Sequence, residues 1–143
     1  MPEQMFSEFK QFYTHFSDHE LGKLDVIYAK DVVFTDPIHS IKGRAALHHY
    51  FADLCENVEE CRFEFLDELV LDNAAYIKWD MHFSHPKIQK GHPLTLRGVT
   101  QLQFGKDGIS YHEDFYDMGA MLYEHVPVIG RCIRWLKRNL AER

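Results

Sequence analysis

The sequence has little of what marks several large classes of protein. Its three cysteines, Cys55, Cys61 and Cys132, are an odd number without zinc-ligand spacing, which argues against both a disulfide framework and a zinc site. No apolar run approaches the roughly 20 residues of a membrane-spanning helix. Acidic residues outnumber basic ones by 22 to 16, and a net charge of −6 argues against a nucleic-acid surface. We therefore expect neither nucleic acid nor a membrane as a partner.

From the sequence we also expect neither an internal linker nor a leader sequence. No repeat or Pro/Gly-rich stretch divides the 143 residues, so we expect one domain over 1–143. The polar start, Met1-Pro2-Glu3-Gln4, does not resemble a signal peptide. Together with the reduced thiols that the cysteine count indicates, this predicts a cytoplasmic protein.

Aromatic residues, in contrast, are abundant: 11 Phe, 7 Tyr and 2 Trp make up 14% of the chain. Large rings fill protein cores, and they also line cavities for small molecules. Both interpretations stay open for each ring.

Helical spacing dominates the first part of the chain. Apolar residues recur at helical intervals from Met5 to about Phe16, and a second apolar stripe predicts another helix that ends near Tyr28. A third helix is predicted from Arg44 to about Asn57. Its candidate buried residues are Ala45, Leu47, His48, Tyr50, Phe51 and Leu54.

Between the second and third helices, Val32–Thr35 predicts a short strand. The strand ends at Asp36-Pro37 because proline cannot donate to a neighbouring strand, and 38–43 is predicted to be a loop.

From residue 60 the period changes from helical to two. Four long antiparallel strands are predicted at 61–71, 75–83, 94–104 and 109–116. Helices followed by strands indicate an α+β fold, in which a bent sheet carries the helices on its concave face. The residues that alternate along the first three strands are Phe63, Phe65, Leu69 and Leu71; Ala75, Ile77, Trp79, Met81 and Phe83; and Leu94, Leu96, Gly98, Thr100, Leu102 and Phe104.

The chain closes with a helix to about Leu140. Residues 131–143 are strongly basic, and basic side chains near a helix C-terminus complement the helix dipole. The alternative is a helix that binds a membrane surface or an acidic partner.

The order and spacing of these elements resemble the nuclear transport factor 2-like superfamily, and within it the SnoaL-like domain family. The resemblance spans nearly the whole chain. It rests on the N-terminal helix pair, Tyr28-Ala29, Val33-Phe34-Thr35-Asp36-Pro37, Gly43 and the strand that ends at 112–117. It implies a cone-shaped, curved antiparallel sheet wrapped around N-terminal helices, an internal pocket and a homodimer through the outer sheet face. Members include ketosteroid isomerase, polyketide cyclases, dehydratases and binding domains without chemistry, so the fold alone does not give the function.

The resemblance places Asp36 where ketosteroid isomerase has its proton-shuttling carboxylate. A carboxylate beside an apolar pocket loses solvation and becomes a better base. Alternatively, Asp36 accepts backbone N–H bonds from its own turn, as Asp before Pro commonly does. His39 could orient Asp36, or join it and His112 as a metal ligand. Because the family mostly works without metals, we expect neither a metal nor a cofactor.

The isomerase also uses a Tyr and a protonated Asp as oxyanion donors. The resemblance assigns the first role to Tyr13, which a core position would explain equally well. Thr100 stands where the second acid belongs. A hydroxyl donates more weakly, and this departure argues against steroid isomerisation itself.

Two faces of the strand 109–116 compete for the pocket. Apolarity would turn Ile109 and Phe115 inward, whereas the resemblance turns His112, Asp114 and Tyr116 toward the cavity. On one face, the Asp114 carboxylate would fix the tautomer of His112, which suits acid–base catalysis. The alternative is a polar face toward solvent or a second copy.

The expected pocket wall consists of Tyr28, Phe34, Trp79 and Met81, with an ordinary core as the alternative. Three functions follow from these residues. The first is cofactor-independent isomerisation, dehydration or cyclisation of a small apolar carbonyl compound, with Asp36, His112 and Asp114 as catalytic residues. The second is a regulatory or ligand-binding module without chemistry. The third is a structural dimer whose cavity is packed shut.

Overall fold

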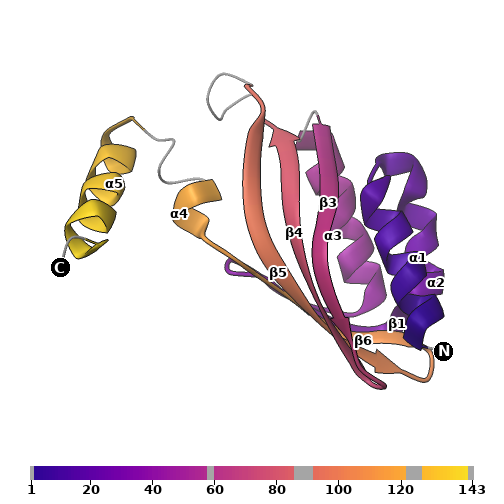
Figure 1. Ribbon diagram of the computed structural model, residues 1–143. Coiled ribbons are helices and arrows are strands. Elements are labelled where there is room, and N and C mark those ends of the chain that lie inside the picture. The colour runs from indigo at the N-terminus through magenta and orange to yellow at the C-terminus, as the bar shows by residue number, and fades with distance from the viewer. Residues whose placement is uncertain (1, 58–59, 86–91, 122–126, 142–143) are drawn as a thin grey trace.

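One curved six-stranded sheet organises the chain, and helices cover its concave side (Figure 1). The computed structural model describes residues 2–57, 60–85, 92–121 and 127–141. The strands lie in the order β2-β1-β6-β5-β4-β3. Their bounds are β1 (Tyr28–Thr35), β2 (Ser40–Lys42), β3 (Glu60–Val70), β4 (Ala74–Ser84), β5 (Leu94–Gly105) and β6 (Gly108–Tyr116). The α+β prediction is confirmed, but the sheet is mixed, because β1 runs parallel to β6 while the other neighbours are antiparallel.

The N-terminal helices differ from the predicted pair. α1 (Pro2–Thr14) buries Phe6, Phe9 and Phe12 on one stripe, as the spacing predicts. The second helix is instead a 3₁₀ segment, η1 (Asp18–Lys23), followed by the short α2 (Leu24–Ile27). Tyr28 is not helical, because its backbone is extended and it pairs with Ile109 as the first residue of β1.

The segment 38–43, predicted to be a loop, contains the short strand β2. The Asp36 backbone N–H donates to the His39 carbonyl at 2.9 Å, which turns the chain back so that β2 pairs with β1. Gly43 then adopts a φ of 95° and donates its N–H to Val32, a conformation that favours glycine. Helix α3 (Arg44–Asn57) begins directly after it, and its Ala45 and His48 are exposed, contrary to the expected buried side.

Two bulges decide which side chains face the helices. In β3 the register shifts between Phe65 and Asp67, and Leu69 is 59% exposed although the alternation placed it with Phe63 and Phe65. In β6 the register shifts at Ser110, so Ile109 and His112 both face inward. A bulge adds one residue to a strand and therefore reverses the alternation beyond it.

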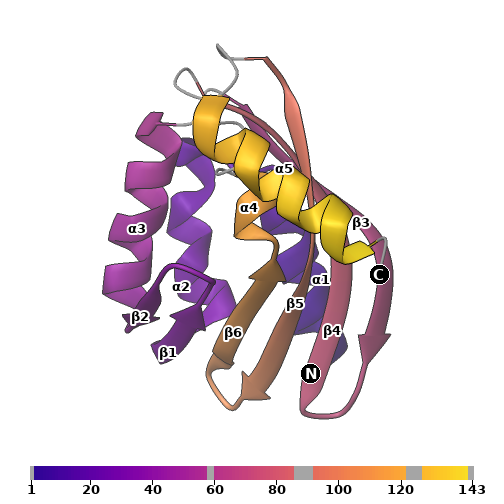
Figure 2. The ribbon, with the colours of Figure 1, turned by 90° about the vertical axis from the view of Figure 1, so that its left-hand side faces the viewer.

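The C-terminal part lies on the other side of the sheet. After α4 (Met118–Met121), helix α5 (Pro127–Ala141) lies opposite α1 and α3 (Figures 1 and 2). Its Lys137 pairs with Asp117, and Trp135 and Leu140 are more than half exposed. No helix in the described part of the chain is long and apolar enough to cross a membrane.

Candidate functional site

A cavity of about 410 Å³ lies between the concave face of the sheet and the helices α1 and α3. Ligand pockets usually measure roughly 300–1,000 Å³, so this cavity is large enough for a small molecule. Its wall is mostly aromatic and aliphatic. The described lining residues are Tyr13, Phe16, Ser17, Phe34, Asp36, Ile38, His39, Tyr50, Phe51, Leu54, Cys55, Cys61, Phe63, Trp79, Met81, Phe83, His85, Asp114 and Tyr116.

Trp79 fixes one side of this wall. The alternation of β4 turns it inward, and its cross-strand partner is Gly98 of β5. A Cβ at Gly98 would overlap the indole ring and lie only 2.8 Å from the Phe115 carbonyl oxygen. Glycine at this position therefore leaves the space in which the Trp79 ring lies across the sheet.

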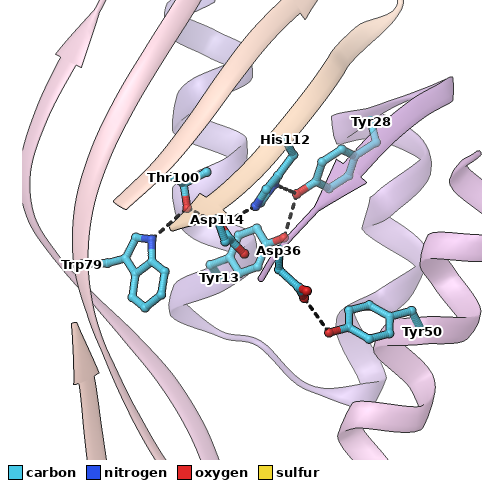
Figure 3. A network of polar contacts seen from close by, with 8 residues as sticks. All are labelled: Tyr13, Tyr28, Asp36, Tyr50, Trp79, Thr100, His112 and Asp114. Atoms are coloured by element: carbon cyan, nitrogen blue, oxygen red, sulfur yellow. Dashed lines mark hydrogen bonds and ion pairs between the residues drawn. The ribbon is translucent and has the colours of Figure 1, made fainter. Parts of the chain in front are cut away.

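Asp114 is the carboxylate at the sheet side of the cavity (Figure 3). Its Oδ1 accepts the Thr100 hydroxyl at 2.5 Å and the His112 Nε2 at 2.7 Å. Its Oδ2 accepts no hydrogen bond from any residue that the structure describes, and the side chain keeps 18% of its surface exposed. One oxygen is therefore held in place, and the other is left available on the cavity side.

Behind Asp114, hydrogen bonds continue through the protein to Tyr13 (Figure 3). His112 Nδ1 lies 2.8 Å from the Tyr28 hydroxyl, and the Tyr13 and Tyr28 hydroxyls lie 2.7 Å apart. His112 is only 1% exposed, and the ring centroid of Phe34 lies 4.5 Å from its own. On the other side, the Trp79 indole N–H donates to Thr100 at 2.7 Å.

When His112 is neutral, the available hydrogen atoms fix which group donates in each hydrogen bond between Thr100 and Tyr13. An ionised Asp114 can only accept, so Thr100 donates its hydroxyl hydrogen and His112 carries its hydrogen on Nε2. Nδ1 then accepts from Tyr28, whose oxygen accepts from Tyr13. Burial is the main cause that raises the pKa of both tyrosines, so they remain protonated donors.

Asp36 is the second carboxylate of the cavity, and its oxygens are more fully used. Oδ1 accepts the backbone N–H groups of Ile38 and His39 at 2.9 and 2.7 Å. Oδ2 accepts the Tyr50 hydroxyl at 2.9 Å. The predicted turn-capping role is therefore present, and it occurs at the cavity wall.

The charges of both carboxylates act on two further hydroxyl groups, those of Tyr116 and Tyr50. The pKa of Tyr116 is raised, first by burial and then by the charges of Asp36 and Asp114. Burial also raises the pKa of Tyr50, with Asp36 as the next cause. Both therefore remain protonated near neutral pH. The Tyr50 hydroxyl is engaged by Asp36, whereas Tyr116 hydrogen-bonds to no residue in the described ranges.

The expected site residues separate into two groups. Eight of them line the cavity: Tyr13, Phe34, Asp36, His39, Trp79, Met81, Asp114 and Tyr116. Tyr28, expected in the wall, lies behind it, as do Thr100 and His112. The hydroxyls of Tyr13 and Thr100, the two expected oxyanion donors, are both occupied within the protein.

The sequence interpretation missed Tyr50 as a site residue. It was assigned only to the buried side of the third helix, and nothing in the sequence connects it with Asp36. Phe63 was likewise recognised as an inward residue but not as part of the cavity wall. Among the described residues, no three His, Cys, Asp or Glu side chains come together in a way that could hold a metal ion.

Comparison with known families now identifies the chain. The SnoaL-like domain family matches residues 9–112, and the chain belongs to it. No curated protein matches the sequence.

Solved structures agree with this assignment at the level of the fold. An NTF2-like protein of unknown function from Burkholderia pseudomallei K96243 is similar with a TM-score of 0.74 and 16% identity, covering 85% of this chain and 94% of that one. A proposed SnoaL-like polyketide cyclase from Jannaschia sp. CCS1 has a TM-score of 0.73 and 10% identity, covering 85% and 90%. A protein from Catenulispora acidiphila DSM 44928 with a ketosteroid isomerase-like fold, solved in complex with trimethylamine, has a TM-score of 0.71 and 16% identity, covering 85% and 92%.

Proposed function

We propose that the chain catalyses cofactor-independent proton transfer at a carbon next to a carbonyl group, in a small apolar compound bound in the cavity. The observation that carries this proposal is the unequal use of the two oxygens of Asp114. Oδ1 is fixed by Thr100 and His112, while Oδ2 has no partner among the described residues. A base needs a lone pair that faces the substrate and a side chain that does not rotate away from it.

In this mechanism Asp114 Oδ2 takes a proton from the α-carbon. The C–H electrons become the enolate C=C bond, and the carbonyl π electrons move to oxygen. Tyr116 donates its hydroxyl hydrogen to that oxygen, because it is protonated and lies on the same face of β6 as the base. Return of the proton to another carbon completes an isomerisation. In a cyclisation the enolate attacks a second carbonyl, and the oxygen of that carbonyl takes the proton from Asp114. In a dehydration the β-hydroxyl group takes this proton and leaves as water.

His112 acts through Asp114 and is a positioning residue. It does not line the cavity, and its Nε2–H holds Oδ1 while Tyr28 fixes its other nitrogen. Asp36 is the competing base. Its three hydrogen bonds favour a structural role in the turn before β2 and in holding Tyr50.

The structural relatives support this class of function without fixing the reaction. They include a proposed polyketide cyclase and a proposed hydroxylase, AclR from Streptomyces galilaeus. One relative with this fold was solved in complex with trimethylamine, which supports the proposal that the cavity binds a small molecule.

An assay that does not require the natural substrate can test the proposal. The protein is incubated with a panel of small apolar ketones in D₂O, and loss of the α-proton signal is followed by ¹H NMR. We expect enzyme-dependent exchange with at least one ketone, and a loss of about 10²-fold or more in Asp114→Asn. Asp80→Asn is the matched control, because Asp80 lies on the opposite face of β4, paired with Arg97. Exchange that is unchanged in Asp114→Asn would contradict the proposal.

A second function is ligand binding without chemistry. It is favoured by the number of polar groups around the cavity that already bond to one another, including Tyr13, Thr100 and Tyr50. Pairing of two copies through the outer sheet face, where Phe115 and Tyr76 are exposed, stays a prediction, as does a cytoplasmic location.

A further inference from the structure

The charge on the cavity wall is unusual for a site of this kind. Both carboxylates are largely buried, with side chains 4% exposed at Asp36 and 18% at Asp114. No Lys or Arg is among the described residues that line the cavity. By contrast, Asp80 pairs with Arg97 and Asp25 pairs with Arg44. Two buried carboxylates without a cation are costly, because buried charges are normally paired.

The hydrogen-bond partners of these carboxylates are backbone N–H groups, hydroxyl groups and an imidazole, none of which carries a permanent charge. Asp36 accepts two backbone N–H groups and the Tyr50 hydroxyl. Asp114 accepts the Thr100 hydroxyl and the buried His112. The other titratable groups in the wall are the His39 and His85 imidazoles and two thiols. His39 Nδ1 lies 3.4 Å from Asp36, with 44% of its side chain exposed, and burial raises the pKa of the Cys61 thiol to about 12.

The two negative charges act on the same part of the cavity. Burial is the largest cause that raises the pKa of Tyr116, and the charges of Asp36 and Asp114 are the other two causes. Both charges also raise the pKa of Tyr50. The field between the carboxylates therefore favours positive charge. A single group placed there would interact with both.

Aromatic rings surround this negative region. Trp79 lies with its ring centroid 5.3 Å from Phe63 and 6.3 Å from Tyr116, and Phe34 lies 5.7 Å from Tyr50. All five line the cavity. Aromatic faces attract alkylated ammonium groups, which shed water more readily than a primary ammonium and keep their charge.

We propose that the ligand of this cavity carries an alkylated amine as well as apolar surface. The amine supplies to Asp36 and Asp114 the permanent positive charge that no Lys or Arg among the described lining residues provides, and its alkyl groups contact the rings of Trp79, Tyr116 and Phe34. Anionic ligands such as free acids and phosphate esters are excluded by the same two charges. The inference rests on the proposed function only in taking this cavity as the ligand site, and it narrows the substrate to an apolar carbonyl compound with an amine.

Three soluble probes of one shape separate charge from size. Choline is the cation, 3,3-dimethyl-1-butanol is its neutral isostere, and 3,3-dimethylbutanoate is the anion. Binding is measured by the fluorescence of Trp79 in a Trp135→Phe background, which removes the exposed second tryptophan. The titration is run at about pH 8.5, and the three probes are compared in the same buffer.

We expect choline to bind about tenfold or more tightly than the neutral isostere, and the anion not to bind. Asp36→Asn and Asp114→Asn should each reduce this preference, and the double variant should abolish it. Asp80→Asn should leave it unchanged. Near-ultraviolet circular dichroism checks that each variant is folded, and the three-probe comparison on the unsubstituted cavity stands without any variant.

Three results would overturn the inference: equal binding of the neutral isostere, a choline preference that survives in the double variant, or no saturable choline binding. Turnover is not measured, so this outcome is separate from the α-proton exchange test. Exchange of a ketone without a charge preference would leave the proposed function standing and remove the amine. A charge preference without exchange would support the amine and contradict the proposed function.

Discussion

Replacing Tyr28 by Phe tests the hydrogen-bond chain that positions Asp114. The substitution removes one oxygen from the centre of the chain and keeps the ring that packs beside His112. That oxygen accepts from the Tyr13 hydroxyl and donates to His112 Nδ1. Tyr28 is 0% exposed, Tyr13 5% and His112 1%, so neither former partner is well placed to reach solvent instead.

The expected cost follows from the two groups left without partners. Each buried donor or acceptor that loses its hydrogen bond costs about 1–3 kcal/mol. Tyr28→Phe should therefore lower the free energy of unfolding by about 2–4 kcal/mol, since the substitution also removes the burial of the Tyr28 hydroxyl itself. This is a large fraction of the roughly 5–15 kcal/mol that stabilises a typical domain.

Urea unfolding at pH 7 of four proteins measures this cost: the unsubstituted chain, Tyr13→Phe, Tyr28→Phe and the double variant. In the double variant the orphaned Tyr13 donor is also gone. We therefore expect its loss of stability to be smaller than the sum of the two single losses, by about 1–2 kcal/mol. The reasoning is refuted if Tyr28→Phe changes stability by less than about 0.5 kcal/mol, or if the two single effects add.

Two more predictions concern the tyrosines and the cavity wall. Because burial raises the pKa of Tyr13 and Tyr28 in the folded state, their contribution is fully present below the unfolded tyrosine pKa of roughly 10 and is lost as pH rises above it. The free energy of unfolding should fall there by about 1.4 kcal/mol per pH unit for each tyrosine, and urea titrations from pH 8 to 11.5 should give a shallower fall in Tyr13→Phe. Equal slopes would contradict this cause. Gly98→Ala should cost about 1–3 kcal/mol and alter Trp79 fluorescence, because the new methyl overlaps the indole, whereas Gly22→Ala, with nothing within 4 Å, should stay within about 0.5 kcal/mol. A Gly98→Ala variant as stable as the Gly22→Ala control would show that the Trp79 ring can move at little cost.

The parts of the fold that the sequence predicted are those where one periodicity runs unbroken. β4 and β5 alternate without interruption, and Trp79 and Thr100 face inward as expected. The same rule failed in β3 and β6. The extra residue of a bulge, Leu66 or Ser110, fits the composition of a regular strand, so nothing local distinguishes it.

The bulge at Ser110 also resolves the competition between the two faces of the last strand. Apolarity favoured Ile109, and the resemblance favoured His112 and Asp114. The register shift turns all three inward.

The roles within the site could not be read from the sequence, because they depend on partners that are distant along the chain. Thr100 was taken as the replacement of a missing acid. In the fold it holds the carboxylate of Asp114 and accepts from Trp79. Asp36 was the first candidate base, and its occupation by Tyr50 becomes visible only when α3 packs over β1.

The central claim is that Asp114, and not Asp36, is the base. The direct measurement is the rate of α-proton exchange in D₂O for Asp114→Asn and Asp36→Asn, measured side by side on the ketone that the unsubstituted protein exchanges fastest. The account predicts a loss of about 10²-fold or more for Asp114→Asn and a clearly smaller loss for Asp36→Asn. A larger loss in Asp36→Asn, with Asp114→Asn close to the unsubstituted rate, would contradict it and return the role of base to Asp36.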